Sequence, residues 1–348
     1  PTIAGLARIV RSRDQLPEEA TTAIAPSKDE EIVRAPLSPL QSRLWFLQLL
    51  TPENTAYNIY SCHSIRGSLD KDALSWSIAQ VVARHDSLRT RFESEDDRVW
   101  QVTDPALEIP LEFFDLTDLD ENTRNEAFDR LDKEAGYWQF DLREAPLIRF
   151  RLIRLGKSEH RLQFFQHHII SDGWSLANIY KEIRALYTAR ISGAQGCPLP
   201  PVEAQYPSYA QEQHDFVRSG GHDSQLSYWV DQLTGIPDAI ELPADKPRPV
   251  VQTFTGKSQQ GRIPAETATK LKKAGVDRGL TLYMTLLSLF QLLNSRLSGH
   301  KVLTAGTPFA LRDQVRLRGA VGFFMNTLVL KADLDEASTF ADLLKQSR

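Results

Sequence analysis

The stretch Gln166-His167-His168-Ile169-Ile170-Ser171-Asp172-Gly173-Trp174 lies between two segments of different periodicity. Residues 161–165 before it form a short apolar and aromatic run, which predicts a strand. Apolar residues recur at helical spacing from Leu176 to Tyr187, which predicts a helix. Asp172 is suited to cap that helix, and Gly173 allows the backbone to turn. Two adjacent histidines therefore stand where a strand ends and a helix begins.

The two histidines are expected to have different roles. Side chains alternate along a strand, so His167 and His168 point to opposite faces. An imidazole titrates near neutral pH and is suited to moving a proton during a reaction. We predict that His168 is the catalytic residue and that His167 makes structural hydrogen bonds. The alternative is that both are ordinary polar residues at a strand end, and the pair alone does not exclude it.

Composition limits the class of protein. The 348 residues are 41% hydrophobic and 25% charged, which fits an ordinary globular protein with room for two lobes. The net charge of −4 gives no reason to expect nucleic acid or an anionic membrane as partner. No apolar run reaches the ~20 residues that a membrane span needs. Cys62 and Cys197 are far apart and indicate neither a disulfide framework nor a metal site, so we expect a cytoplasmic protein.

Four further runs occur in order along the chain. Ser38–Trp45 is predicted to begin a helix, and Arg84–Phe92 follows a helix predicted over Asp70–Ala83. Tyr206–Ala210 and Gly319–Thr327 come later. Together with the pattern His-His-x-x-x-Asp-Gly, these runs resemble the signature motifs of the condensation-domain superfamily of nonribosomal peptide synthetases.

The resemblance covers residues 36–348 and includes departures from the usual motifs. Leu40 replaces the usual Ala, Asp86 the usual Glu, and Ser208 the usual Asp. The sixth and seventh motifs of the family are absent.

The apolar run from Thr281 to Leu297 predicts a buried core helix.

The resemblance implies an α/β (α+β) fold of two chloramphenicol-acetyltransferase-like lobes in a V shape, with the active site in a tunnel between them. We expect an N-terminal lobe at residues 36–205 and a truncated C-terminal lobe at 206–348. Residues 1–11 resemble the last helix of a peptidyl carrier protein, which often begins Pro-Thr-Ile. Residues 12–35 are charged, contain Ala and Pro, and are predicted to be a linker.

The resemblance also implies residues that support the site. For the charged run of the second motif there are two interpretations: its side chains are simply solvated, or one arginine, Arg84 or Arg89, is buried and pairs with Asp172, which would brace the turn. Backbone N–H groups after Gly173 would help to bind an oxyanion. The other expected supporting residues are His167, Trp174, Gln41, Arg43 and Asn326.

The implied reaction is peptide-bond formation, an acyl transfer. An acceptor aminoacyl amine would attack a donor peptidyl thioester, with His168 as a base or as a positioning group. Donor and acceptor peptidyl carrier proteins would bring both substrates on 4′-phosphopantetheine arms, next to neighbouring synthetase domains of the same polypeptide. No cofactor or metal is expected on this chain itself. The alternatives are an acyltransferase with a soluble acceptor and an inactive domain that only docks carrier proteins.

The run Asp172-Gly173-Trp174-Ser175 resembles the family's L-donor subclass, which accepts a donor ending in an L residue. A steric effect of the Trp174 indole on the donor would be the physical basis. The alternative is that Trp174 packs inward as the first core residue of its helix and only marks lineage.

Overall fold

The computed structural model describes residues 32–347 except 97, 195, 237–238, 251, 255 and 335–338. The resemblance of residues 1–11 to a carrier protein, and the predicted linker up to residue 31, lie outside the described residues. The end of the predicted linker is wrong, because Val33–Pro36 forms strand β1 and pairs with strand β4.

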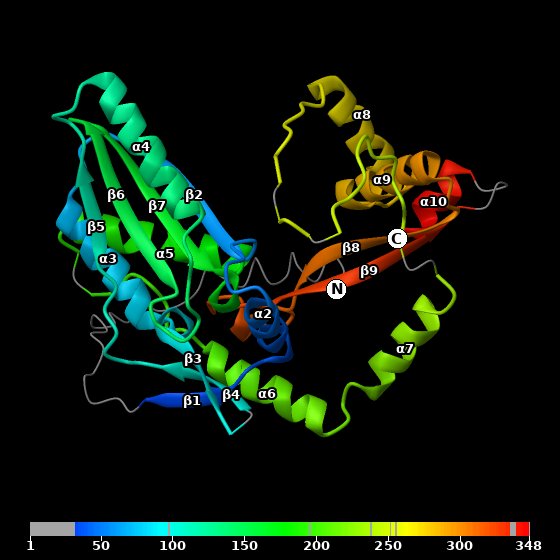
Figure 1. Ribbon diagram of the computed structural model, residues 1–348, viewed down its shortest axis with the longest axis horizontal. Helices are drawn as coiled ribbons and strands as arrows, with labels where there is room; N and C mark the ends of the chain where they lie inside the picture. The colour runs from blue at the N-terminus through cyan, green and yellow to red at the C-terminus, as the bar shows by residue number, and fades with distance from the viewer. Residues whose placement is uncertain are drawn as a thin grey trace. The chain divides into compact units, whose positions relative to one another are not determined.

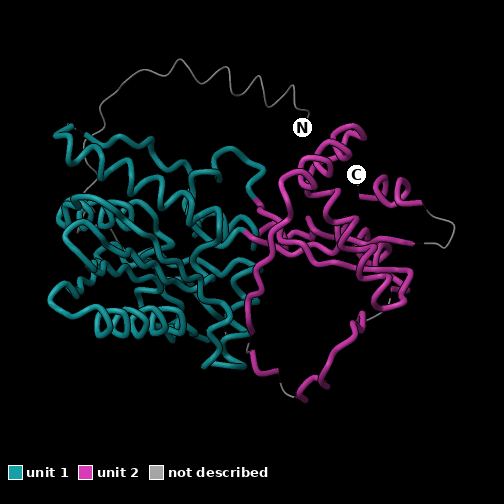
Figure 2. The backbone as a smooth tube through the Cα atoms, turned by 90° about the horizontal axis from the view of Figure 1, so that it is seen from above, with its two compact units in different colours: residues 1–214, 312–324 teal, residues 215–311, 325–348 magenta. Residues whose placement is uncertain are grey.

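The chain divides into two compact units, shown in Figure 2. Of the described residues, unit 1 contains 32–214 and 312–324, and unit 2 contains 215–311 and 325–347. The chain thus leaves unit 1 inside helix α6 and contributes one later segment to it. We call residues 312–324 the return segment. The predicted lobes, 36–205 and 206–348, remain a prediction and do not include this exchange.

The main sheet of unit 1 has the order β2–β7–β6–β5. Strand β7 is antiparallel to both β2 and β6, whereas β5 runs parallel to β6. The predicted strand at 161–165 is the middle of β7. The bounds are β2 (Asn58–Arg66), β5 (Leu111–Asp115), β6 (Ile148–Gly156) and β7 (Glu159–His167).

Helices cover both faces of this sheet (Figure 1). Helix α4 (Glu121–Gly136) lies on one face, and helices α3 (Lys71–Arg84) and α5 (Gly173–Ile191) lie on the other. The side chain of Phe164 in β7 is buried against Phe150 of β6 and Tyr180 of α5, with ring centroids 5.3 Å and 4.8 Å apart. Edge-to-face packing of this kind joins α5 to the sheet.

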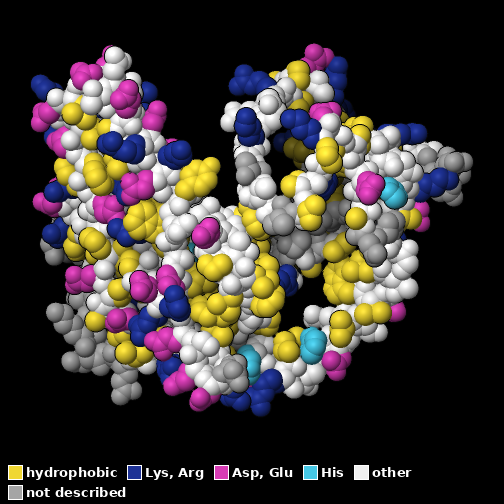
Figure 3. Space-filling model, in the orientation of Figure 1, with side chains coloured by type: hydrophobic (Ala, Val, Ile, Leu, Met, Phe, Trp, Pro, Cys, Tyr) yellow, Lys and Arg dark blue, Asp and Glu magenta, His cyan; other side chains and the backbone are white. Residues whose placement is uncertain are grey.

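A second, smaller sheet completes unit 1. Its order is β1–β4–β3, and all its strand pairs are antiparallel. The remaining elements of unit 1 are β3 (Thr90–Glu95), β4 (Arg98–Thr103), α2 (Pro39–Leu50), the 3-10 turns η1 (Asp86–Arg89), η2 (His168–Ile170) and η3 (Val315–Leu317), and the first part of α6 (Tyr206–Arg218). Acidic and basic side chains are interspersed on the face of unit 1 seen in Figure 3.

Unit 2 contains a two-stranded antiparallel sheet and the remaining helices. Its elements are α7 (Asp223–Leu233), α8 (Ala265–Val276), α9 (Leu282–Ser298), β8 (Val302–Ala310), β9 (Met325–Asp333) and α10 (Phe340–Gln346). Within the described residues of both units, no helix combines the length and the apolar character needed to cross a membrane.

The prediction that residues 281–297 form a buried core helix is only partly correct. The segment is helical, but the side chains of Leu282, Leu286, Leu293 and Leu297 are exposed. The buried residues of α9 are polar: Thr285, Ser288 and Gln291. The reason is that α8 and the end of α10 pack against this polar face, where Ser288 and Ser347 share a hydrogen bond of 2.7 Å.

We predict that Phe164→Ala lowers the free energy of unfolding by about 3–5 kcal/mol, because it removes a buried ring from a packed aromatic cluster. Urea unfolding followed by circular dichroism measures the change. The matched control is Phe113→Ala in β5, whose ring is 41% exposed and should lose less than about 0.5 kcal/mol. Equal losses in the two variants would contradict the assignment of the core to this cluster.

Candidate active site

The predicted strand, turn and helix are present around the two histidines. His167 is the last residue of β7, η2 spans His168–Ile170, and α5 begins at Gly173. Asp172 is the N-cap of α5, and its Oδ1 accepts the N–H of Ser175 at 2.7 Å. The imidazole of His168 is thus held between two packed elements.

Side chains from other elements hold this turn by its carbonyl groups. Gln41 in α2 donates its Nε2–H to the carbonyl of Ile169 at 3.3 Å. Ser87 in η1 donates its hydroxyl to the carbonyl of Ile170 at 2.7 Å. These contacts fix a turn that lacks the hydrogen-bond ladder of a longer helix or sheet.

The environment of His168 determines which ring nitrogen carries the proton. Nδ1 lies 2.8 Å from the carbonyl oxygen of Ser171, which can only accept a hydrogen bond. Nδ1 is therefore the donor, and the neutral ring has its lone pair on Nε2. The edge of the Phe323 ring contacts the same imidazole, with centroids 5.1 Å apart and planes at 69°. The half-buried ring is thus oriented from two sides.

His167 has a different environment and is almost fully buried. Its Nδ1 accepts the N–H of Ile169 at 3.1 Å, within the same turn. Burial, with a smaller contribution from the neighbouring His168, lowers the pKa of His167 from 6.5 to about 3. His167 is therefore neutral at physiological pH.

The predicted partner of Asp172 is wrong. Its carboxylate pairs with Arg312 of the return segment, with Nη2 and Oδ1 3.2 Å apart, and both side chains are buried. Its other oxygen accepts the N–H of Phe324 at 3.0 Å. Asp172 therefore joins the histidine turn, the start of α5 and the return segment.

Arg84 and Arg89 are buried, but their partners lie elsewhere. Arg84 Nε lies 3.2 Å from Glu182 of α5, because the end of α3 packs against that helix. Arg89 pairs locally with Asp86 at 2.9 Å. The charged run of the second motif thus braces the scaffold and not the carboxylate of Asp172.

Sequence reasoning missed Arg312, the buried partner of Asp172. Its guanidinium donates to the carbonyls of Leu317 and Ala320, both at 2.7 Å, and to the hydroxyl of Ser175 at 2.6 Å. It also lies over the Phe324 ring, 4.0 Å from the centroid. In the sequence, the feature that could have pointed to Arg312 is its position shortly before the Gly319–Thr327 motif.

The remaining predicted site residues lie in different surroundings. The Trp174 side chain is 46% exposed and donates its indole N–H to the carbonyl of Arg318 at 3.0 Å, so it is not a core residue of α5. Arg43 is exposed on α2. Asn326 lies in β9 of unit 2, where its oxygen accepts the N–H of Thr327.

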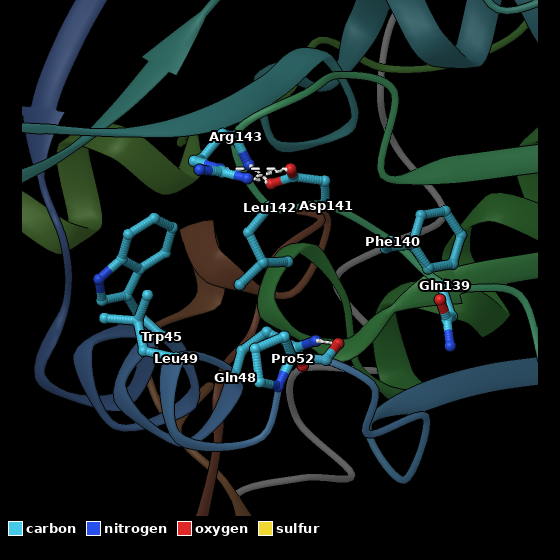
Figure 4. Close-up of a pocket in the computed structure, with 9 residues that line it drawn as sticks. All are labelled: Trp45, Gln48, Leu49, Pro52, Gln139, Phe140, Asp141, Leu142 and Arg143. Carbon is cyan, nitrogen blue, oxygen red and sulfur yellow. Dashed lines mark hydrogen bonds and ion pairs between the residues drawn. The ribbon is translucent and has the colours of Figure 1, made fainter.

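A pocket of about 400 Å³ lies in unit 1 between the C-terminal half of α2 and the loop at 139–143 (Figure 4). The Arg143 guanidinium at its rim pairs with Asp141 at 2.6 Å, as the dashed lines show. None of the predicted site residues lines this pocket. Within the described residues, no group of three or more His, Cys, Asp or Glu side chains could hold a metal ion.

Comparison with known proteins identifies the family. The condensation-domain family model matches residues 32–348. The chain is 38% identical over its full length to a linear gramicidin synthase protein of Brevibacillus parabrevis and covers 7% of that protein. It is 35% identical over its full length to malpibaldin synthetase of Mortierella alpina and covers 6% of it.

The chain belongs to the condensation-domain family. Among solved structures, the X-domain from teicoplanin biosynthesis is 25% identical with a TM-score of 0.78, over 93% of this chain and 71% of that one. The first condensation domain of the CDA synthetase is 21% identical with a TM-score of 0.74, over 90% of this chain and 74% of that one. The fold is accordingly the mixed α/β, chloramphenicol-acetyltransferase-like fold of condensation domains.

We predict that Asp172→Ala lowers the free energy of unfolding by about 3–5 kcal/mol, because it leaves Arg312 buried without its carboxylate. Chemical denaturation measures the loss. The matched control is Asp120→Ala, which removes an exposed N-cap aspartate from α4 and should lose less. Unchanged stability together with lost activity would instead assign Asp172 a chemical role.

We also predict that the buried His167 makes the fold sensitive to mild acid. Because the pKa of His167 is lowered to about 3, the unfolded chain takes up a proton below pH ~6.5 that the folded chain does not bind until pH ~3. The folded state is therefore unaffected by this difference in proton binding above pH ~6.5. It loses stability relative to the unfolded state as the pH falls below that value. Between pH 7 and pH 5, His167→Asn should therefore lose about 2 kcal/mol less stability than the unchanged protein.

Urea unfolding at a series of pH values tests this prediction. The comparison is with the unchanged protein, measured over the same series of pH values. An identical pH dependence for His167→Asn and the unchanged protein would show that His167 does not resist protonation in the folded state.

Proposed function

We propose that this condensation domain forms a peptide bond by attack of an acceptor aminoacyl amine on a donor peptidyl thioester. The observation that carries the proposal is the orientation of His168. Its Nδ1–H is engaged by the Ser171 carbonyl, so the Nε2 lone pair is available to a proton on the attacking nitrogen.

The proposed step moves one proton from the attacking amine to the leaving thiolate. The neutral amine nitrogen bonds to the thioester carbon, and His168 Nε2 takes the proton that the nitrogen loses. The carbon–sulfur bond then breaks, and the proton passes from the imidazolium to the departing thiolate. The N–H groups of Gly173 and Trp174, at the start of α5, would stabilise the oxyanion, since the N–H of Ser175 is already bound to Asp172.

His168 could contribute by proton transfer or by holding the amine in attack geometry. Two tethered reactants gain mainly from reduced entropy when they are correctly placed. A side chain that accepts a hydrogen bond but does not take a proton separates the two contributions. Glutamine at position 168 provides such a side chain.

The proposed substrates arrive on 4′-phosphopantetheine arms of a donor and an acceptor peptidyl carrier protein. The size of the relatives supports this, because the chain spans 7% or less of the length of the two relatives named above. It also matches 24% of the length of a four-domain nonribosomal peptide synthetase of known structure, at 23% identity. We place the reaction in the cytoplasm, next to other synthetase domains.

We predict that His168→Ala folds normally but loses at least about 100-fold in the rate of carrier-to-carrier condensation, the lower range for a lost general base. His168→Gln should restore part of the rate if positioning contributes, and none if proton transfer accounts for the whole effect. The measurement is the initial rate of dipeptidyl-carrier formation, with a circular dichroism spectrum to confirm folding.

Full activity of His168→Ala would refute the proposed role. Condensation with a free amine but not with a loaded acceptor carrier would favour an acyltransferase with a soluble acceptor. Carrier binding without condensation by the unchanged protein would favour the inactive docking domain.

We further propose that the donor ends in an L residue. The Trp174 side chain is exposed next to the His168 turn, and its hydrogen bond to Arg318 restricts the orientation of the indole. A fixed, exposed indole would limit the space on one side of the donor α-carbon.

Donor carriers loaded with the same peptide, ending in an L or a D residue, test this proposal. We expect the L form to condense faster and Trp174→Ala to narrow the difference, because the steric limit is removed. Equal rates for the two forms, or faster use of the D form, would overturn the assignment.

A further inference from the structure

Tyr206 is a fully buried residue that the proposed mechanism does not use. It is the first residue of α6, and its ring lies against Gly322 of the return segment. A Cβ at position 322 would lie 1.9 Å from Cδ2 of the Tyr206 ring. A glycine is therefore required there, because any side chain would displace the ring.

The hydroxyl of Tyr206 belongs to a hydrogen-bond chain whose direction can be assigned. It donates to the carbonyl of Phe323 at 2.7 Å and lies 2.8 Å from the Ser38 hydroxyl. Because the carbonyl can only accept, the Tyr206 proton is committed to Phe323, and Ser38 must donate to Tyr206. Ser38 Oγ in turn accepts the N–H of Gln41 at 3.1 Å. Burial raises the pKa of Tyr206, so the hydroxyl stays protonated.

Both ends of this chain reach the surroundings of His168. At one end, the Tyr206 hydroxyl binds the carbonyl of Phe323, and the ring of Phe323 contacts the His168 imidazole. At the other end, Ser38 and Gln41 form a capping box, and Gln41 Nε2 donates to the Ile169 carbonyl beside His168. The hydroxyl of Tyr206 thus connects two supports of one imidazole without touching it.

We propose that Tyr206 is a positioning residue for the condensation reaction, and that its hydroxyl, oriented by Ser38, fixes Phe323 against His168. The inference rests on the proposed function of His168. Loss of this hydroxyl should lower the rate at saturating substrate and leave binding of the loaded carriers unchanged, since Tyr206 is buried.

The test variant is Tyr206→Phe, which removes the hydroxyl and keeps the ring on Gly322. We expect kcat to fall about tenfold, the effect of one lost hydrogen bond, with KM for the loaded acceptor carrier unchanged. We also expect the NMR signal of the His168 ring, assigned by its absence from His168→Ala, to shift in the variant.

The matched control is Tyr209→Phe. Tyr209 lies in the same helix and packs against the same Phe324 ring, but within the described residues its hydroxyl has no hydrogen bond to the site. Tyr209→Phe should change neither kcat nor the NMR signal of the His168 ring. Equal effects in the two variants, a raised KM with normal kcat, or an unmoved His168 signal in Tyr206→Phe would overturn the proposal.

Ser38→Gly gives a second route if Tyr206→Phe does not fold. It removes the donor to Tyr206, and glycine is tolerated at an N-cap. It should shift the His168 signal in the same way, and an unmoved signal would overturn the proposal. Failure of the unchanged protein to condense carrier-bound substrates would refute the proposed function alone, because the NMR comparison still decides whether Tyr206 positions His168.

Discussion

The buried ion pair between Asp172 and Arg312 is the interaction on which the site depends. Pairs of this kind contribute little net stability compared with apolar packing, but removal of one partner is severe. Its contribution here is positional. Asp172 also caps α5 and accepts the N–H of Phe324, while Arg312 binds two carbonyls of its own segment. A segment more than a hundred residues later in the chain is thereby fixed beside the histidine turn.

The supports of His168 come from separate parts of unit 1. Gln41 belongs to the first helix that the structure describes, Ser87 to the turn after α3, and Phe323 to the return segment. Each contacts the turn or the imidazole directly. A site assembled in this way requires the whole unit to fold before the histidine is oriented, which explains why the motifs are dispersed along the sequence.

The sequence predicted what local chemistry determines. The strand before His167, the turn and the capped helix follow from periodicity and from an aspartate at the N-cap, and all three are present. The partner of Asp172 could not be predicted, because Arg84, Arg89 and Arg312 are all buried arginines and only tertiary packing selects among them. The burial of the apolar face of α9 was predicted incorrectly for a related reason. An apolar face indicates a helix, but it does not indicate which neighbouring element covers that face.

The spacing between His168 and Asp172 has a direct physical explanation. A single peptide unit contains the carbonyl of Ser171 and the N–H of Asp172. The carbonyl accepts the Nδ1–H of His168, while the side chain of Asp172 is held by Arg312. Because a peptide unit is planar and stiff, it rigidly joins the carbonyl that orients the imidazole to the Cα of Asp172, whose side chain Arg312 holds. With one residue more or fewer between His168 and Asp172, the carbonyl that fixes the histidine tautomer and the residue that caps the helix would no longer be joined by a single peptide unit.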